Sequence, residues 1–226
     1  MLFRSIDPPK AESAIRDRGL SSGQVTIHGC DVSDHNAVKL VIGGIASSTR
    51  IDILVNNAGI AHIGNAESTT ASDLDRLYAV NIRGVYNCLN AVIPHMKSAG
   101  GGVILNMASI AGSLGIPDRF AYSMTKGAVL SMTLSVARDF IKNNIRCNSI
   151  SPARVHTPFI DGYLSRDYPG REAEMFEKLS KTQPIGRMAK PDEIANLALY
   201  LCSDAAAFIT GTDYPIDGGF IKLSAG

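Results

Sequence analysis

Short apolar runs alternate with longer stretches of helical periodicity along the whole chain. Near-continuous apolar runs are typical of buried parallel strands, and apolar positions three and four residues apart are typical of helices. We expect strands within residues 24–32, 51–59, 101–109, 144–158 and 212–219, the fourth ending at Pro152. We expect helices over 33–48, 71–98, 120–143 and 191–204, with Ser33 as the N-cap of the first. This order predicts an α/β fold: a doubly wound parallel sheet of the Rossmann type with helices on both faces.

The chain has 226 residues, which suits a single domain over 1–226, and no internal repeat or linker divides it. Its least regular stretch is 158–188. That stretch follows the carboxyl end of an expected strand, where open α/β sheets bind their ligands. We therefore expect 158–188 to be an insertion that forms a substrate loop.

Composition narrows the class of protein. Hydrophobic residues make up 45% of the chain, charged residues 19%, and the formal net charge is +1 without a basic block. These values favour neither nucleic acid nor an anionic membrane surface as a partner. No run of about 18 apolar residues suggests a membrane span. The chain opens without a long apolar stretch of the kind found in signal peptides. A soluble, cytoplasmic protein is the expectation.

The cysteines are Cys30, Cys88, Cys147 and Cys202, far apart in the sequence. They form no CxxC pair and no cluster with histidine of the spacing that a metal requires. We therefore expect reduced, mostly buried thiols and no metal site.

Tyr122 and Lys126 form the first candidate for chemistry, because four residues place them on the same face of a helix. A free phenol has a pKa near ~10 and is a poor acid or base at neutral pH. A neighbouring ammonium favours the phenolate and would bring that pKa closer to neutrality. The spacing alone is weak evidence, and two unrelated helix residues are the alternative.

Two further polar residues lie in suggestive places. Ser109 directly follows the expected strand 101–109, so its hydroxyl would reach the carboxyl edge of the sheet, where it could hold a substrate oxygen. Asn81 lies in the middle of an expected helix and could hold a water behind Lys126. The alternatives are an ordinary loop or cap serine and a solvent-facing asparagine.

These residues belong to an ordered set of motifs that resembles the classical short-chain dehydrogenase/reductase family over nearly the whole chain, from about Gln24. The set comprises NNAG (56–59), Asn81 in NIRG, Ser109, Tyr122-SMT-Lys126, SPARVHTP (151–158), GRMAKPDEIA (186–195) and ITGTDYPIDGG (209–219). One such motif would be weak evidence, whereas the ordered set is specific.

The resemblance implies catalytic roles. Tyr122 would be the acid/base, and Lys126 would lower its pKa and bind the ribose of the nicotinamide nucleotide. Ser109 would position the substrate oxygen, and Asn81 would complete a proton relay. A hydride would pass between NAD or NADP and the substrate carbon.

The resemblance also implies a cofactor site and self-association. The matching cofactor-binding residues are Asp31, Val32, Asn57, Ala58, Gly59, Tyr122, Lys126, Val155 and Thr157. One departure is Ala153, where the family usually has glycine, and alanine fits only if the backbone there needs no positive φ. A homo-oligomer, either a tetramer or a dimer, would form through the helices 71–98 and 120–143.

The largest departure lies at the beginning of the chain. The family starts with a strand and a glycine-rich turn, T-G-x-x-x-G-x-G, that cradles the pyrophosphate at a helix N-terminus. Here MLFRSID (1–7) resembles the second strand of the family, so the first strand, the turn and the first helix are lacking. Two strand edges would then be open, and the second and third strands would close the gap or detach. A mis-assigned start, a shortened isoform and a remnant without dinucleotide binding each explain this N-terminal truncation.

Cofactor preference stays open. An acidic residue that ends the second strand favours NAD, and a nearby arginine favours NADP. Ser5 stands at the deciding position, flanked by Arg4 and Asp7, so both nucleotides remain possible.

Arg119 precedes Tyr122 by three residues and could reach the same cleft, where a guanidinium binds a carboxylate at two points. This is suggestive of 3-hydroxybutyrate dehydrogenase-like members and of sugar or sugar-acid dehydrogenases. A solvated surface arginine is the alternative. Arg154 and His156 flank the nicotinamide end of the expected site.

Together these features predict an NAD(P)-dependent oxidoreductase that acts on a secondary alcohol or ketone, such as a small hydroxy acid or sugar acid. The alternative is a catalytically inactive, truncated scaffold or oligomerisation partner without dinucleotide binding.

Overall fold

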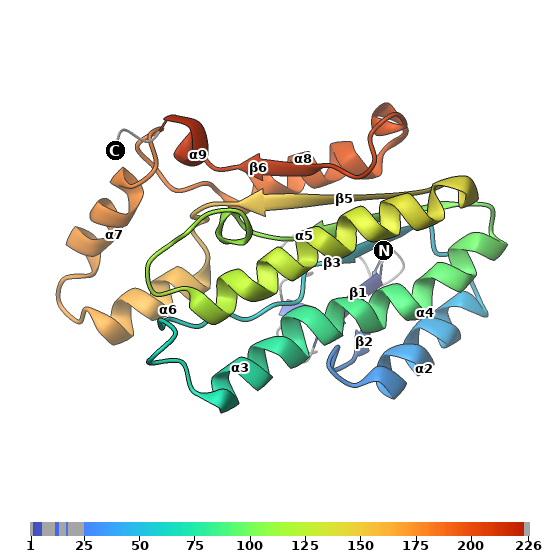
Figure 1. Cartoon of the computed structure of the whole chain (residues 1–226), viewed down its shortest axis with the longest axis horizontal. Coiled ribbons are helices and arrows are strands. Elements are labelled where there is room, and N and C mark those ends of the chain that lie inside the picture. The colour runs from blue at the N-terminus through green and yellow to red at the C-terminus, as the bar shows by residue number, and fades with distance from the viewer. Residues whose placement is uncertain (1, 6–11, 14–16, 18–24, 224–226) are drawn as a thin grey trace.

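The structure is a computed structural model that describes residues 2–5, 12–13, 17 and 25–223. Its main sheet is parallel and has the order β3-β4-β5-β6. The strands are β3 (Ile53–Asn56), β4 (Gly102–Met107), β5 (Ile145–Pro152) and β6 (Asp213–Ile216). Leu105 of β4 lies opposite Val55 of β3 and Asn148 of β5. The expected parallel α/β fold is confirmed, and all four carboxyl ends meet at one edge (Figure 1).

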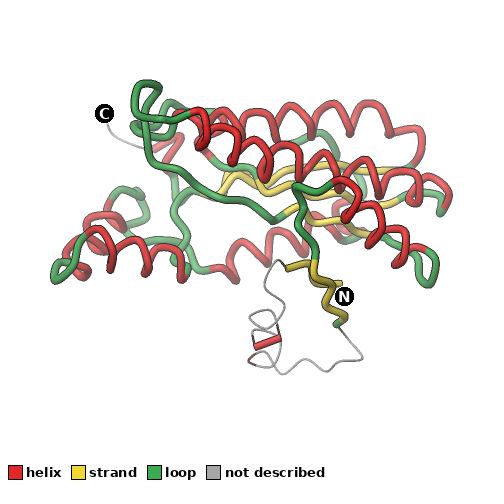
Figure 2. Tube along the Cα trace, turned by 90° about the horizontal axis from the view of Figure 1, so that it is seen from below, coloured by secondary structure: helices red, strands yellow, loops and turns green. Residues whose placement is uncertain are grey.

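A second, smaller sheet stands apart from the first. It consists of β1 (Leu2–Ser5) paired in parallel with β2 (Thr26–Gly29). Figure 2 shows this pair displaced from the four-stranded sheet. Detachment, one of the two expected outcomes at the gap, is therefore what the described strands show.

Among the described residues β3 lies at an edge of the main sheet, where its neighbour is β4 alone. Two apolar side chains of β3, Ile53 and Val55, are 46% and 44% exposed. They lie two residues apart and therefore on the same face of the strand. Such exposure is unusual for apolar residues in a parallel sheet, which is normally covered on both faces.

Helices cover both faces of the main sheet. The first group is α2 (His35–Ala46), α3 (Ala71–Leu77), α4 (Gly84–Ser98) and α5 (Phe120–Phe140). On the opposite face lies α8 (Pro191–Cys202). The shorter helices are η2 (Ile110–Gly112), η3 (Ile141–Asn143), η4 (Asp204–Ala206) and α9 (Phe220–Leu223).

Two expectations about the helices need correction. The N-cap of α2 is Asp34 instead of Ser33, because the Asp34 carboxylate accepts hydrogen bonds from the backbone N–H groups of Asn36 and Ala37. The Ser33 hydroxyl donates to Asp31 instead. The stretch 71–98 is divided by a π-helical segment, η1 (Tyr78–Arg83), in which the backbone carries an extra residue per turn.

The stretch 158–188, expected to be the least regular, is largely helical. It contains α6 (Pro158–Asp167) and α7 (Glu172–Lys181). Pro158 suits a first helical turn, and Arg171 pairs with Glu174 one turn later along α7. Leu164 of α6 and Met175 of α7 are buried.

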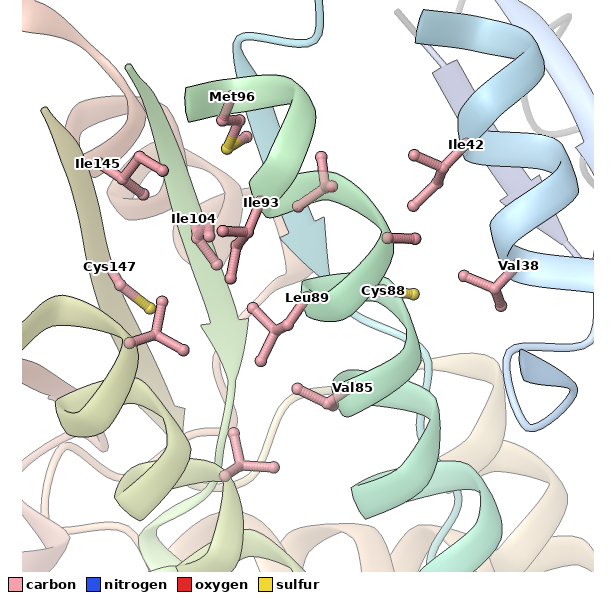
Figure 3. Close-up of a cluster of buried hydrophobic side chains, with 14 of the residues drawn as sticks. Val38, Ile42, Val85, Cys88, Leu89, Ile93, Met96, Ile104, Ile145 and Cys147 are labelled. Carbon is pink, nitrogen blue, oxygen red and sulfur yellow. The ribbon is translucent and has the colours of Figure 1, made fainter. Parts of the chain in front are cut away.

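Alternate residues of the central strands form two separate cores. Ile104 points into a cluster shared with α2, α4 and α5, part of which Figure 3 displays. Its neighbour Leu105 packs on the other face against Ile194 and Leu201 of α8. Cys30, Cys88 and Cys147 are buried, as expected, and no disulfide joins any of the four cysteines in the described part of the chain. In the described part of the chain, no helix is long and apolar enough to cross a membrane.

Candidate active site

Tyr122, Ser109, Lys126 and Asn81 come together at the carboxyl edge of the main sheet. Ser109 follows β4, Tyr122 and Lys126 lie in the first turns of α5, and Asn81 lies in the π segment. The Ser109 side chain lies close enough to Tyr122 to lower the pKa of its phenol. The Lys126 ammonium lies 5.7 Å from the centre of the Tyr122 ring. The four residues named as catalytic from the sequence are thus neighbours in space.

Ser109 has a structural role as well as a position beside Tyr122. It is the N-cap of η2, and its hydroxyl accepts a hydrogen bond from the backbone N–H of Ala111 at 3.2 Å. The same hydroxyl is 3.5 Å from the carbonyl oxygen of Pro152, the last residue of β5. The cap fixes the Ser109 hydroxyl in front of the Tyr122 phenol.

The electrostatics of Tyr122 differ from the expectation. Burial raises the pKa of Tyr122, whereas the hydrogen bond from Ser109 and the positive charge of Arg119 lower it. The Lys126 ammonium is directed elsewhere, because its Nζ donates a 2.7 Å hydrogen bond to the carbonyl oxygen of Met107. In this structure burial thus dominates the pKa of the phenol, and Arg119 contributes a positive charge that favours the phenolate.

Lys126 is itself unusual, because its side chain is only 7% exposed. Burial lowers the pKa of its ammonium to about 8. No ion pair joins Lys126 to a carboxylate in the described part of the chain; its recorded partner is the neutral carbonyl of Met107. A buried ammonium held by one carbonyl keeps donors free for a further polar ligand.

Asn81 is 1% exposed, so the alternative of a solvent-facing asparagine is wrong. Its Oδ1 accepts from the N–H of Ile60, and its Nδ2 donates to the Ile60 carbonyl and to the Thr125 hydroxyl, all at 2.9–3.0 Å. The π segment turns this side chain inward. Asn81 therefore attaches the loop after β3 to α5. Thr125 was not identified from the sequence, although its position between Tyr122 and Lys126 was a signal.

The loop after β3 provides a cradle beside these residues. A Cβ added to Gly59 would lie 3.4 Å from the Asn81 Oδ1 and 3.6 Å from the Lys126 Nζ. Asn57, Ala58 and Gly59 are exposed in the same loop. The open backbone at Gly59, next to a buried ammonium with free donors, fits the ribose and nicotinamide end of a dinucleotide.

The remaining cofactor candidates lie at the ends of other strands. After β2, the Asp31 carboxylate accepts from the Ser33 backbone and hydroxyl at 2.8 Å. The Val32 carbonyl accepts from the Asn87 side chain of α4 at 2.9 Å, which ties this end of β2 to the main body. After β5, Val155 forms a parallel bridge with Ala189, and Thr157 occupies the N-cap position of α6.

The departures noted in the sequence have different outcomes. Ala153 has no positive φ, so alanine is accommodated there, and its N–H donates to the carbonyl of Ile216. Arg4 and Ser5 lie in β1, whereas Asp7 lies outside the described residues. No T-G-x-x-x-G-x-G motif occurs in the sequence, so the cradle described above concerns the nicotinamide end alone.

Arg119 lies at the start of α5 and next to the loop after β3. It forms a parallel bridge with Gly64, and its Nη1 donates to the Asp118 carbonyl at 3.1 Å. It is partly buried and close enough to Tyr122 for its charge to act on the phenol. The His156 ring lies 2.8 Å from the carboxylate of Asp161 in α6.

Comparison with known proteins agrees with this geometry. A family model described as enoyl-(acyl carrier protein) reductase matches residues 6–221. The 2-keto-3-deoxy-L-fuconate dehydrogenase of Xanthomonas campestris is 34% identical over 209 residues, which cover 92% of this chain and 68% of that protein. The D-threitol dehydrogenase of Mycolicibacterium smegmatis is 40% identical over 205 residues, covering 90% and 75%.

A solved structure of ElxO with NADP bound superimposes with a TM-score of 0.90 at 26% identity. It covers 98% of this chain, and the match covers 88% of ElxO. Fold, site and relatives define a Rossmann-type oxidoreductase. The chain belongs to the short-chain dehydrogenase/reductase family, whose members use NAD or NADP to oxidise or form CH–OH groups.

Proposed function

We propose that this protein transfers a hydride between NAD or NADP and a secondary alcohol or ketone, with Tyr122 as the acid/base. One observation carries the proposal: Tyr122 has Ser109, a buried ammonium 5.7 Å from the centre of its ring and the cradle at Gly59 as neighbours. When bound, the dinucleotide supplies the hydride donor or acceptor.

Each residue of the site has a role either in transferring a proton or in positioning the substrate and the cofactor. The Tyr122 hydroxyl protonates the carbonyl oxygen during reduction and removes the alcohol proton during oxidation. Ser109, fixed by its cap, holds that oxygen through a hydrogen bond. Lys126 holds the ribose hydroxyls with its free donors, and Asn81 positions the loop that carries Gly59.

The other candidate residues hold the dinucleotide along its length. Asp31 and Val32 would contact the adenine, Asn57 and Ala58 the middle of the cofactor, and Val155 and Thr157 the carboxamide. Neither nucleotide is favoured by these residues, since the ones that would discriminate lie in or beside β1.

The substrate is proposed to be a small hydroxy acid or sugar acid. Arg119 supports this choice because its partly buried guanidinium lies close to Tyr122. One relative is named for a keto-deoxy sugar acid and another for a neutral polyol. A guanidinium beside the reacting phenol favours an acidic substrate over a neutral polyol, because a guanidinium binds a carboxylate.

The organisation of the protein completes the proposal. One Rossmann-type domain carries the site, and 158–188 forms its substrate loop. We expect a homo-oligomer, a dimer or a tetramer, because Tyr86, Phe120 and Leu134 expose large apolar side chains on α4 and α5. A cytoplasmic location agrees with cysteines that form no disulfide in the described part of the chain.

The substitution Tyr122→Phe tests the proposal. Removing the hydroxyl should lower kcat by about 10²–10⁴-fold, the usual contribution of general acid–base catalysis. Titration with NADH and with NADPH, followed by nicotinamide fluorescence, should give the same affinity as the unsubstituted chain. Tyr200→Phe, at an exposed position of α8, is the matched control and should keep full activity.

Normal turnover by Tyr122→Phe would contradict the acid/base role. A folded chain that binds neither nucleotide would instead favour the inactive scaffold. The preferred nucleotide in the titration decides between NAD and NADP.

A further inference from the structure

Two arginines beside the site have no acidic partner. Arg119 and Arg154 form no ion pair with a carboxylate in the described part of the chain. Arg166, Arg171 and Arg187, by contrast, each hold an acidic side chain at 2.7 Å. Partly buried guanidiniums without a counter-charge are costly, so an anion that binds between them would be stabilised.

Arg154 is held in place by the end of α7. It follows β5 by two residues, and its backbone carbonyl accepts from the N–H of Ala189 at 3.0 Å. Its Nε donates to the hydroxyl of Thr182, also at 3.0 Å. Thr182 is fixed in turn, because it is the C-cap of α7 and donates to the carbonyl of Leu179 at 2.6 Å.

The bond to Thr182 leaves the two terminal nitrogens of the Arg154 guanidinium able to bind a ligand. Neither terminal nitrogen of Arg154 makes a hydrogen bond with a described residue, since the Thr182 contact uses Nε. Arg119 likewise uses only Nη1, toward the Asp118 carbonyl. The two side chains therefore keep several donors in the planar arrangement that suits carboxylates.

The positive charge of Arg119 acts on Arg154. The pKa of Arg154 is lowered, first by burial and then by the positive charge of Arg119. Arg119 also acts on the pKa of Tyr122 and on that of Tyr163 in α6. A like charge this close is unfavourable in the empty site, and a bound anion would relieve the repulsion.

The chain path supports the same placement. Arg119 starts the helix that carries Tyr122, and Arg154 lies two residues beyond Pro152, whose carbonyl faces the Ser109 hydroxyl at 3.5 Å. Arg119 thus lies at the start of α5 and Arg154 just beyond the end of β5, next to the segments that carry Tyr122 and face Ser109.

We propose that Arg154 is a second substrate-binding residue, which together with Arg119 binds the carboxylate of a hydroxy acid whose alcohol carbon faces Tyr122. This inference rests on the proposed function and deepens it, because it assigns the acid to a two-arginine site. Thr182 is a positioning residue: it orients the Arg154 fork from the end of α7, so the substrate loop takes part in recognising the acid.

The test compares Arg154→Gln and Arg119→Gln in the full chain, on the pairs threonate and threitol, and 3-hydroxybutyrate and its primary amide. Each substitution should lower kcat/KM for the acid by about 10- to 100-fold, mainly through KM, because a charge-assisted hydrogen bond is lost. The neutral partner should change by less than about threefold. Arg138→Gln, about 24 Å along α5 from Tyr122 at a rise of ~1.5 Å per residue, should change neither.

Thr182 is tested separately. Thr182→Ala should raise KM for the acid about fivefold with an unchanged kcat, because the Arg154 fork loses one hydrogen bond. Thr182→Ser keeps the hydroxyl and should restore the KM. A loss in both variants would mean that Thr182 acts only through the fold of α7.

Equal losses on acids and on neutral partners would overturn the inference, as would activity confined to threitol and the amide. Preferential oxidation of glycerol 3-phosphate would assign the site to phosphate instead of carboxylate.

A binding measurement separates this inference from the proposed function. Malonate, which has no hydroxyl, should raise the midpoint of thermal unfolding of the unsubstituted chain but not of Arg154→Gln. That result would stand even if no alcohol were oxidised, and the absence of a difference would refute the two-arginine site.

Discussion

The two sheets of this protein differ in how completely they are built. In the four-stranded sheet, β4 and β5 each have a partner on both sides, and most of the side chains of β5 are buried. In the two-stranded sheet, β2 has one partner, β1, and none of the side chains of β2 is fully buried. Ser109, Tyr122, Lys126 and Asn81 all belong to the first region, and the adenine-end candidates Asp31 and Val32 to the second.

This difference suggests the hypothesis that the catalytic region is the more stable of the two. Tyr122 and Lys126 are placed by α5, which packs on β4 and β5 through buried side chains such as Val129. Val32 is tied to α4 by the bond from Asn87 to its carbonyl, whereas the Asp31 carboxylate accepts from Ser33. We therefore expect the two halves to differ in stability, and three measurements address this.

The largest expected effect is a contrast between two core substitutions. Ile104→Ala empties a fully buried position of β4 and should lower the free energy of unfolding by about 2–5 kcal/mol. Ile27→Ala, at a half-buried position of β2, should cost about 1 kcal/mol or less. Urea unfolding of both variants measures the contrast. Equal costs would show that the two sheets unfold as one unit of similar packing.

The second measurement concerns the buried Lys126. Because burial lowers its pKa from 10.5 to about 8, the folded state disfavours its proton. The stabilising contribution of the neutral amine is fully present above pH 10.5 and is lost as the pH falls through about 8. Unfolding free energies of the unsubstituted chain and of Lys126→Met should diverge over this window by on the order of 3 kcal/mol.

The control for that experiment is Lys97→Met, at an exposed position of α4. Its difference from the unsubstituted chain should not vary over the same pH window. If Lys126→Met showed no pH-dependent difference either, the ammonium of Lys126 would be solvated, and the catalytic half would be looser than the structure indicates.

The smallest expected effect comes from Asn81→Ala. The substitution removes the bonds to Ile60 and Thr125 and leaves buried polar groups unpaired, which should cost about 1–3 kcal/mol. The kcat should also fall, because the loop with Gly59 would lose its attachment to α5. Asn90→Ala, exposed on α4, should leave stability and kcat unchanged in the same assays.

Much of the fold could be predicted from local patterns. The strands after residue 50 and the helices α5 and α8 lie within the expected ranges, because apolar runs and helical periodicity are properties of consecutive residues. Patterns were less informative at 158–188, where the abundance of glycine, proline and charge concealed two short helices. The cap of α2 was displaced from Ser33 to Asp34, since adjacent residues compete for the same backbone donors.

The candidate site was predictable in its members but not in its electrostatics. The order of motifs identified Ser109, Tyr122 and Lys126, and the structure places them together. The cation that acts on the Tyr122 phenol is nevertheless Arg119, because the Lys126 ammonium turns to the Met107 carbonyl. Which donor finds which acceptor depends on distances that residue spacing does not contain.

By itself, the sequence determined the alternation of strands and helices and the set of side chains capable of the chemistry, since these depend on residue types and their order. The tertiary structure decided the rest. It separated β1 and β2 from the main sheet and buried Asn81 within a π turn. It also joined Arg154 by a hydrogen bond to Thr182, which is 28 residues away. Such outcomes depend on burial and on contacts between distant segments, and those exist only once the chain has folded.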